Sequence, residues 1–556
     1  MRPLTGGKRE LLGRLAAMPF LDRVEMAAVS GLCRSAAYTA ARQLEDAGLI
    51  SSIPHGTELV PSTRRFHLTS DGLRRLAQEE GVTVEAMLRS RPLAARWRRV
   101  LLERLDAAAV IYRLASAVAN VHHPIQFRWY RAMPMDAAII LPGGRTVAVV
   151  RQGPTADRTG FSKRPRRLRN GPRPGGVLLI APDEVRLRHA RTTLGRRSVP
   201  AFHALERDAA AATTDDPVWR LSSVEASVSL RDAIDRIDRR GALPIERPLA
   251  RGSYMPGDIE GQDAWGSVPE HMLPALLRPA EKRTLDLLSD WPWLALGDLA
   301  GLLGVTNQRA SQLATALEGF GLAARVPAAD RRLVLTDAGL ALLARRDRTA
   351  VGGAKKRWSA APENTGDWRG VPGRCSRQLL RDMEHTASVH GFVSALARQA
   401  PGLGWELEQL DPPMRASRYF RHLGGRRSIH PDAFGMLRRG KARRPFFLEW
   451  ERRAVRPVTM AARLAPYLRY YSTHRPIDDH GAPPVLLIVF DEDIAETHFL
   501  RVAQEEMDRL RTSVPLLASH RGLLEREGPL GRAWLIPGGG FQPISPLPNA
   551  QGERQP

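Results

Sequence analysis

The pattern of apolar and polar positions in this chain occurs twice. Near the start, residues 11–15, 21–29 and 35–47 each follow an amphipathic helical period, and Gly48 marks the end of the third helix. Two short strand patterns follow at residues 49–53 and 65–68, around a polar loop that contains Pro and Gly. The same order returns at residues 285–288, 296–303 and 307–320, with Gly321 after the third helix and strands on both sides of 327–331. Each half is therefore predicted to begin with three helices, a two-stranded hairpin and a closing helix, for which Thr69 or Ser70 is the expected cap in the first half.

Short stretches of sequence repeat along with this pattern. MPFL at 18–21 returns as WPWL at 291–294, LEDAGL at 44–49 as LEGFGL at 317–322, and LTSDG at 68–72 as LTDAG at 335–339. Further along, LASAVA at 114–119 matches FVSALA at 392–397, VLLIAPDE at 177–184 matches VLLIVFDE at 485–492, and RRSVP at 196–200 matches RTSVP at 511–515. The difference in residue number between matched stretches grows along the chain, as expected if the loops of the second copy are longer. We therefore interpret the chain as two copies of a two-domain unit.

The second part of each copy follows a different pattern. Residues 379–397 are predicted to form a helix, residues 404–410, 432–437 and 445–450 three strands, residues 459–471 a helix, and residues 484–490 a buried apolar strand. Residues 100–210 are expected to repeat this order, with Asp136 equivalent to Asp432 and Val150 equivalent to Glu449.

Composition agrees with several modest domains. A chain of 556 residues with 43% hydrophobic positions can bury several cores. No stretch reaches the length of a membrane span and the N-terminus has no signal-peptide core, so we expect a cytoplasmic, nucleoid-associated protein without a membrane partner. Cys33 and Cys375 alone provide neither a disulfide framework nor a cysteine zinc site. The net charge of +24 suits a polyanion partner, although a general bias toward arginine would also produce it.

The first module of each copy resembles the winged helix-turn-helix domain. In such a domain the third helix enters the major groove of DNA and the hairpin, or wing, contacts phosphates. The resemblance implies double-stranded DNA as partner; a packing or dimerising role for either module is the alternative. The candidate contact residues on the helices are Arg34, Ser35, Tyr38 and Arg42 in the first copy and Thr306, Asn307, Gln308, Arg309 and Gln312 in the second. The candidates on the hairpins are Arg64, Arg65, Arg331 and Arg332.

The second module resembles the restriction-endonuclease-like fold, and its acids resemble the PD-(D/E)xK motif. Asp432 opens one predicted strand, and alternation places Glu449 and Glu451 on the same face of the next. Together they could bind Mg²⁺ or Mn²⁺ and activate water, with Glu384 as an outer ligand. The motif's lysine is replaced by Glu451; Arg463 on the following helix is the candidate substitute, although arginine cannot exchange protons as lysine does. The alternative is that the acids pair with Arg452, Arg453 or Arg456, but Phe446, Phe447 and Leu448 suggest a strand covered on both faces. His385, His390 and His430 are expected to pack or hydrogen-bond rather than bind metal.

The order of the modules, with Pro-Asp at 431–432, FLEWER at 447–452 and a helix that ends near Tyr471, resembles the replication-relaxation family of bacterial mobile elements. The resemblance covers residues 280–520 well and 10–210 more faintly. It implies a role in plasmid replication or conjugal DNA processing, with relaxase or replication proteins as further partners and a homodimer left open.

The first copy departs from the acidic pattern. Val150 and Gln152 stand where the second copy has Glu449 and Glu451, so this module is predicted to be catalytically inactive. The arginine-rich stretch 158–173 is interpreted as a loop that either follows a DNA backbone or is a solvated insert.

We thus predict an α/β (α+β) protein in which two winged helix-turn-helix domains alternate with two restriction-endonuclease-like domains. The expected bounds are 1–95, 96–240, a linker 241–275, 276–346, a basic linker 347–376, 377–530 and a disordered tail 531–556. The leading functional hypothesis is a DNA-binding protein of a plasmid or integrative element. The alternatives are a metal-dependent endonuclease and a transcriptional regulator whose nuclease-like domains are inactive.

Overall fold

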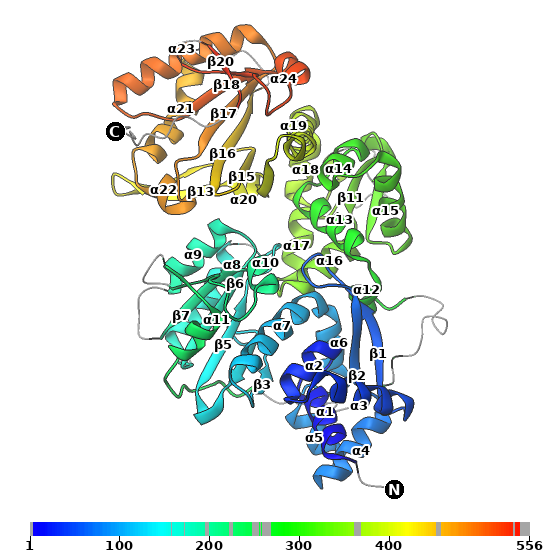
Figure 1. The fold of residues 1–556 in the computed structure, drawn as a ribbon. Helices are drawn as coiled ribbons and strands as arrows, with labels where there is room; N and C mark the ends of the chain where they lie inside the picture. The colour runs from blue at the N-terminus through cyan, green and yellow to red at the C-terminus, as the bar shows by residue number, and fades with distance from the viewer. Residues whose placement is uncertain are drawn as a thin grey trace. The chain divides into compact units, whose positions relative to one another are not determined.

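The computed structural model describes residues 4–156, 158–171, 173–194, 199–221, 226–246, 255, 257, 259, 268–360, 368–451, 457–537 and 540–544. It shows a mixed α/β protein with two large mixed sheets and three small hairpins (Figure 1). The chain forms two compact units, one of residues 1–283 with 338–355 and one of residues 284–337 with 356–556. No helix in these described ranges is long and apolar enough to cross a membrane.

Helical module 1, residues 6–80, has the predicted order of elements. Its helices are α1 (Gly6–Ala17), α2 (Arg23–Ser30), α3 (Arg34–Asp46) and α4 (Ser70–Glu80), and its hairpin is β1 (Ile50–His55) with β2 (Thr63–Leu68). Asp22 and Glu25 form a capping box at the start of α2, and Gly31, with φ of 69°, ends it. A Cβ on Gly72 would lie 1.9 Å from the carbonyl oxygen of Leu49, which explains the glycine of the Leu-Thr-x-x-Gly motif.

Helical module 2, residues 279–346, repeats this order. Its elements are α13 (Pro279–Asp290), α14 (Leu296–Leu303), α15 (Asn307–Gly319), β10 (Ala323–Val326), β11 (Arg332–Leu335) and α16 (Asp337–Arg346). Residues 338–346 of α16 belong to the first compact unit. The helix α17 (Val351–Trp358) follows, so the stretch expected to be a linker contains a helix.

Backbone hydrogen bonds show that the two helical modules are structural repeats. The amide of Phe20 donates to Phe66 O at 2.7 Å, and the amide of Trp293 donates to Leu333 O at 3.0 Å. Both donors have left-handed backbone angles, with φ of 72° at Phe20 and 68° at Trp293. The hydroxyls of Thr69 and Thr336 each donate at 2.6 Å to the glycine carbonyl that follows the third helix. The repeated sequence therefore encodes repeated geometry.

Sheet module 1, residues 105–235, contains a seven-stranded sheet in the order β3-β4-β5-β6-β7-β8-β9. Its strands are β3 (Gln126–Trp129), β4 (Ala137–Ile140), β5 (Thr146–Arg151), β6 (Gly176–Ala181), β7 (Ala201–Leu205), β8 (Trp219–Leu221) and β9 (Ser227–Val228). Its helices are α7 (Leu105–Val121), α8 (Arg158–Asn170), α9 (Glu184–Leu194), α10 (Glu206–Ala211) and α11 (Leu230–Asp235); α5 (Val84–Ser90) and α6 (Ala95–Glu103) precede it.

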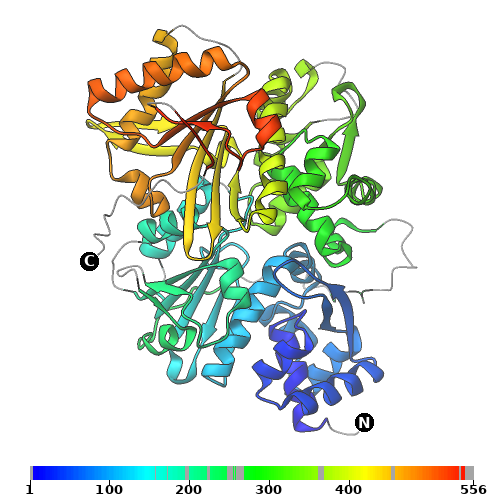
Figure 2. The same ribbon diagram turned by 45° about the horizontal axis from the view of Figure 1, so that its top comes forward.

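Sheet module 2, residues 383–544, has the sheet order β12-β15-β16-β17-β18-β19-β20. Figure 2 draws most of this module in yellow to red. Its strands are β12 (Glu406–Asp411), β15 (Ala433–Arg439), β16 (Ala442–Glu451), β17 (Val485–Phe490), β18 (Leu516–His520), β19 (Trp534–Leu535) and β20 (Phe541–Gln542). Its helices are α19 (Met383–Gly402), α20 (Pro413–Ala416), α21 (Pro457–Tyr471), α22 (Arg475–His480), α23 (Asp493–Leu510) and α24 (Arg521–Glu527), and α18 (Arg374–Arg381) precedes it. An unpredicted hairpin of β13 (Arg418–His422) and β14 (Gly425–Ile429) separates β12 from β15.

The two sheets have the same strand directions and the same register. In each, the first three strands are antiparallel neighbours, and the third, fourth and fifth run parallel. Asp136 donates its amide to Val149 O and Asp432 donates to Leu448 O, both at 2.8 Å. Val150 and Glu449, the next residues, therefore hold the same strand position, which confirms their predicted equivalence.

One predicted match is a residue out of register. Sequence similarity pairs Val177 with Val485, but Gly176 is the residue that lies opposite Val147 as Val485 lies opposite Phe446. The sequence alignment is in error by one residue because both strands consist of apolar residues, so that a shifted alignment still matches leucine with leucine.

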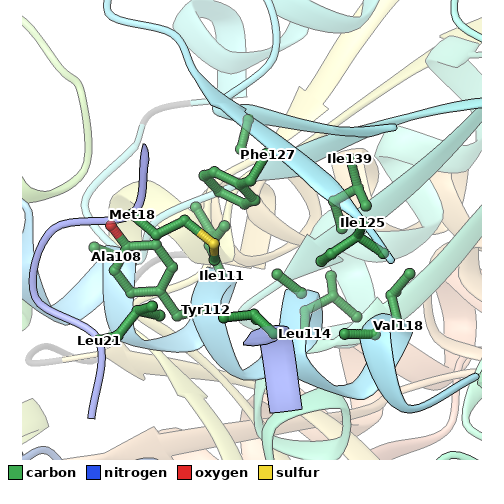
Figure 3. Packing of buried hydrophobic residues seen from close by; sticks show 14 of the residues in the cluster. Met18, Leu21, Ala108, Ile111, Tyr112, Leu114, Val118, Ile125, Phe127 and Ile139 are labelled. Atoms are coloured by element: carbon green, nitrogen blue, oxygen red, sulfur yellow. The ribbon is translucent and has the colours of Figure 1, made fainter. Parts of the chain in front are cut away.

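The core of the first unit runs through both of its modules. Figure 3 shows Met18 of helical module 1 among Ile111 and Tyr112 of α7 and Phe127 of β3, all of which belong to one buried cluster. A second cluster fills the opposite face of the sheet, where α8 and α9 contribute Phe161 and Leu187. The expected boundary at residues 95 and 96 falls inside this unit and stays a prediction.

Candidate functional sites

Asp432 is held at the start of β15 by three interactions. Its amide donates to Leu448 O, and its Oδ2 accepts a hydrogen bond from the Trp450 amide at 2.8 Å. His385 on α19 places Nε2 2.9 Å from Oδ1. Burial lowers the pKa of His385, but the hydrogen bond and charge of Asp432 outweigh burial, so that the pKa is raised. Asp432 and His385 thus form a polar pair in which the imidazole holds its proton more strongly than an ordinary histidine does.

Glu449 and Glu451 share one face of β16, as their spacing predicts. Both line a cavity of about 350 Å³ together with Arg463 and Tyr467 of α21 and Ile488 of β17. Pro445 to Leu448 of the same strand are buried, which agrees with the prediction that the strand is covered on both faces. The cavity therefore combines two carboxyl groups, one guanidinium and apolar walls.

The carboxyl group of Glu449 keeps its proton to a higher pH than an ordinary glutamate does. Burial and the neighbouring Asp432 raise its pKa to about 8, against the opposing effects of Tyr467 and Arg463. The Tyr467 hydroxyl donates a hydrogen bond to Glu449 Oε1. Burial and the nearby Glu449 raise the pKa of Tyr467 in turn. Glu449 consequently carries a proton for much of the time at neutral pH.

Glu451 is buried and forms an ion pair with Arg463. Arg463, the predicted substitute for the missing lysine, thus reaches the acidic residues, where it pairs with Glu451. The alternative partners Arg452, Arg453 and Arg456 lie outside the described residues.

The predicted metal ligands are not arranged as a cation site. Within the described ranges, no group of three His, Cys, Asp or Glu side chains could hold a metal ion. Asp432, Glu449 and Glu451 each have a protein donor of their own, and Glu384 is exposed on the first turn of α19. The residues as placed therefore do not fit Mg²⁺ or Mn²⁺, which require several converging oxygen ligands.

The three histidines pack or hydrogen-bond, as expected. His390 is buried with its ring 5.8 Å from that of Trp291, and burial lowers its pKa to about 3. His430 lies between the hydroxyls of Ser417 and Ser428, at 2.9 and 2.8 Å. His385 hydrogen-bonds to Asp432, and the sequence did not predict this partner because the two residues are 47 positions apart.

Arginines occupy the equivalent site of the first copy. Asp136 accepts from the Arg151 amide at 2.7 Å, from Arg164 at 2.6 Å and from Arg348 at 2.6 Å. Arg164 follows Val150 by the same number of positions as Arg463 follows Glu449. Burial would raise the pKa of Asp136, but Arg164 and Arg348 hold it well below its usual range. Asp136 is therefore a permanent anion neutralised by guanidinium groups.

A second layer of ion pairs continues from this aspartate. Arg151 pairs with Glu206 at 2.5 Å and with Asp347 at 3.1 Å, and Arg346 pairs with Asp347 at 3.0 Å. All four side chains are buried. Val150 and Gln152 stand in place of the acids here, and the catalytic inactivity of the first copy stays a prediction.

The arginine-rich stretch 158–173 is a helix over most of its length, not the predicted loop. α8 turns Phe161, Pro165 and Leu168 inward and exposes Lys163, Arg166, Arg167 and Arg169. None of these four cations has a hydrogen-bond or ion-pair partner in the described part of the chain. In the same register, the second copy has Ala462, Ala465, Pro466 and Leu468. The basic face is therefore a property of the first copy and not of the chain as a whole.

Most of the predicted helix contacts are accessible. Thr306 caps α15 by accepting from the Arg309 amide at 3.2 Å. The exposed residues are Arg34, Ser35 and Arg42 on α3 and Thr306, Asn307, Gln308, Arg309 and Gln312 at α15. Tyr38 is half-buried, with the guanidinium of Arg23 6.0 Å from the centre of its ring.

One of the four predicted hairpin contacts, Arg65, is inaccessible, and a second, Arg332, is half-buried. Arg65 is fully buried, pairs with Glu25 and donates to Phe20 O at 2.9 Å. Arg332 is its counterpart and donates to Trp293 O at 3.1 Å. Both arginines tie the hairpin to the loop after the first helix, and the predicted phosphate contact of Arg332 stays a prediction. Arg331 is exposed, and Arg64 is 60% exposed beside Glu45.

Comparison with protein-family models, with curated proteins and with solved structures finds no match to this chain.

Proposed function

We propose that this chain is a duplex-DNA-binding protein in which two winged helix-turn-helix domains alternate with two restriction-endonuclease-like domains. The observation that carries the proposal is the exposed polar face at the start of α15. Thr306 caps the helix, and Asn307, Gln308, Arg309 and Gln312 extend from it into solvent. A helix that follows a short turn and precedes a hairpin is the element that such domains insert into the major groove.

The side chains on this face suit base recognition. Asn and Gln can form paired hydrogen bonds with adenine, and Arg can do so with guanine. On the α3 face, Arg34 and Arg42 supply charge but fewer groups that distinguish bases. We therefore assign sequence preference to α15 and a supporting role to α3, with the exposed Arg64 and Arg331 on phosphates.

The sheet modules support the helical modules and add phosphate contacts in this proposal. The free cations of α8 match the charge density of a nucleic-acid backbone. The assignment to replication or transfer of a plasmid or integrative element, with relaxase or replication proteins as partners, rests on the sequence resemblance.

The test is selection of binding sites from a random duplex library, followed by fluorescence anisotropy. We expect wild type to select a preferred site, and Asn307→Ala with Gln308→Ala and Arg309→Ala to lose that preference while retaining non-specific binding. Arg501→Ala with Gln504→Ala changes exposed residues of α23 and should leave the preference intact. A triple variant that selects the same site as wild type would contradict the assignment of α15.

A metal-dependent endonuclease is the second candidate function. It is favoured by the position of Glu449 and Glu451 in one cavity with Arg463, beside the strand that Asp432 opens. Against it, each acid has a protein partner and the donors do not converge. Nicking of supercoiled plasmid that requires a divalent ion and Glu449 would establish this second candidate.

A further inference from the structure

The hairpin β13–β14 is an insertion found in the second copy alone. It forms a sheet of its own and connects β12 to β15 through residues that include α20. In the first copy, residues 130–136 connect β3 to β4, and all seven are described and contain no strand. The core of the sheet therefore does not need this hairpin.

The base of the hairpin is anchored and its outer half projects. Arg418, Phe420 and Ile429 are buried, and the Phe420 ring packs 5.3 Å from Tyr470 of α21. Beyond these residues, Arg421, Arg426 and Arg427 are exposed. An arm with a fixed base can present its tip in a defined direction.

An apolar residue occupies the tip. Leu423 is 93% exposed and has φ of 47°, and Gly424 after it has φ of 77°. Two-residue hairpin turns with positive φ at both positions favour Asn-Gly, because a branched apolar side chain is strained in that region. Asparagine would suit this turn better, so the geometry of the turn does not account for a leucine at its tip.

The residues around the tip suit a polyanion. Arg421, Arg426 and Arg427 have no ion-pair partner in the described ranges, and Arg426 lies 5.0 Å from the centre of the Tyr419 ring. A protein surface with an apolar centre and cations at its rim is complementary to a partner that is negatively charged and can accept a hydrocarbon group. Duplex DNA meets both requirements, since its phosphates flank stacked bases.

We propose that the β13–β14 hairpin is an arm that enters the minor groove of duplex DNA and inserts Leu423 between base pairs. The proposal rests on the proposed DNA-binding function and adds a second contact to it. Leu423 has no donor or acceptor with which to read a base edge, whereas apolar wedges of this kind unstack a base step and bend the duplex. The three arginines would hold the phosphates on both sides of the groove.

The test measures bending by energy transfer between fluorophores at the two ends of a duplex of about 30 base pairs that contains flexible TA steps. Wild type is expected to bring the ends together, as a kink of about 20–90° does. Leu423→Asn should abolish this change while phosphate-driven binding remains. Because Asn-Gly is the favoured turn, this variant is expected to keep the hairpin folded. Ile494→Asn removes another exposed apolar side chain, 64% accessible on α23, and should bend DNA as wild type does.

A second variant, with alanine at Arg421, Arg426 and Arg427, should reduce the slope of log affinity against log salt by about 3. Wild type that binds duplex without bending it, or a Leu423→Asn variant that bends it equally, would overturn the hairpin proposal and leave the proposed function intact. Wild type that binds no duplex at all would overturn both.

Discussion

Replacing Glu449 by glutamine should make the protein more stable at high pH. The folded-state pKa of about 8 exceeds the ordinary value of 4.5, because burial and Asp432 disfavour the carboxylate. Below pH 4.5 the carboxyl is neutral in both folded and unfolded chains, and the neutral form in the fold carries no penalty. As the pH rises toward 8, the unfolded chain releases its proton while the folded chain retains it, so the stability that this group contributes is lost.

The difference between the two pKa values corresponds to at most about 5 kcal/mol, at about 1.4 kcal/mol for each pH unit. Glu449 is partly exposed, and screening by solvent lowers the expected effect to about 2 kcal/mol, or a shift of about 5 °C in Tm.

The assay is thermal unfolding of both proteins between pH 5 and pH 9. The Tm of Glu449→Gln should match wild type near the acidic end and exceed it increasingly toward the alkaline end. Glu505→Gln, at a side chain that is 61% exposed on α23, should give a constant difference across the range. Parallel profiles for wild type and Glu449→Gln would refute the reasoning, because they would show that the carboxyl titrates alike in the folded and unfolded chains.

Three further predictions concern other parts of the chain. Alanine at Arg65 should destabilise the first unit by about 3–5 kcal/mol in denaturant unfolding, because it leaves Glu25 buried without its partner, whereas alanine at the exposed Arg64 should cost about 1 kcal/mol or less; equal losses would contradict this. On the basic face of α8, alanine at Lys163, Arg166 and Arg167 should reduce the slope of log affinity against log salt by about 3. Alanine at the exposed but ion-paired Arg74, Arg89 and Arg231 should leave the slope unchanged. An unchanged slope in the α8 variant would show that α8 does not contact the duplex. Supercoiled plasmid should remain intact with Mn²⁺ or with EDTA, and Mn²⁺-dependent nicking that Glu449→Ala abolishes would replace the main proposal with the endonuclease.

Sequence alone predicted the order of elements well where the pattern is amphipathic. Helix ends at glycines and the alternation in β16 located the helices and the shared face of Glu449 and Glu451. The duplication was visible because the residues that fix turns were retained, such as Gly72 against the Leu49 carbonyl. These features depend on residues that are close together in the sequence, and a single sequence shows such relations directly.

The remaining features depend on contacts between distant residues. Arg65 reads as a wing cation, but its partner Glu25 lies 40 positions earlier and buries it. In the sequence, Asp136 is the one acid of the predicted metal site that the first copy retains. Its partner Arg348 lies 212 positions away, so only the folded structure shows the pair. The β13–β14 hairpin was missed because its polar, arginine-rich sequence lacks the apolar alternation of a core strand.

The most direct test of the central claim, that this chain binds duplex DNA largely through its cations, is the salt dependence of wild-type binding to a duplex without a preferred site. The exposed cations of α3, α8, α15 and the hairpins predict a slope of log affinity against log salt steeper than about −4, since each phosphate contact contributes about −0.9. Affinity that stays nearly constant between low and physiological salt would contradict the account.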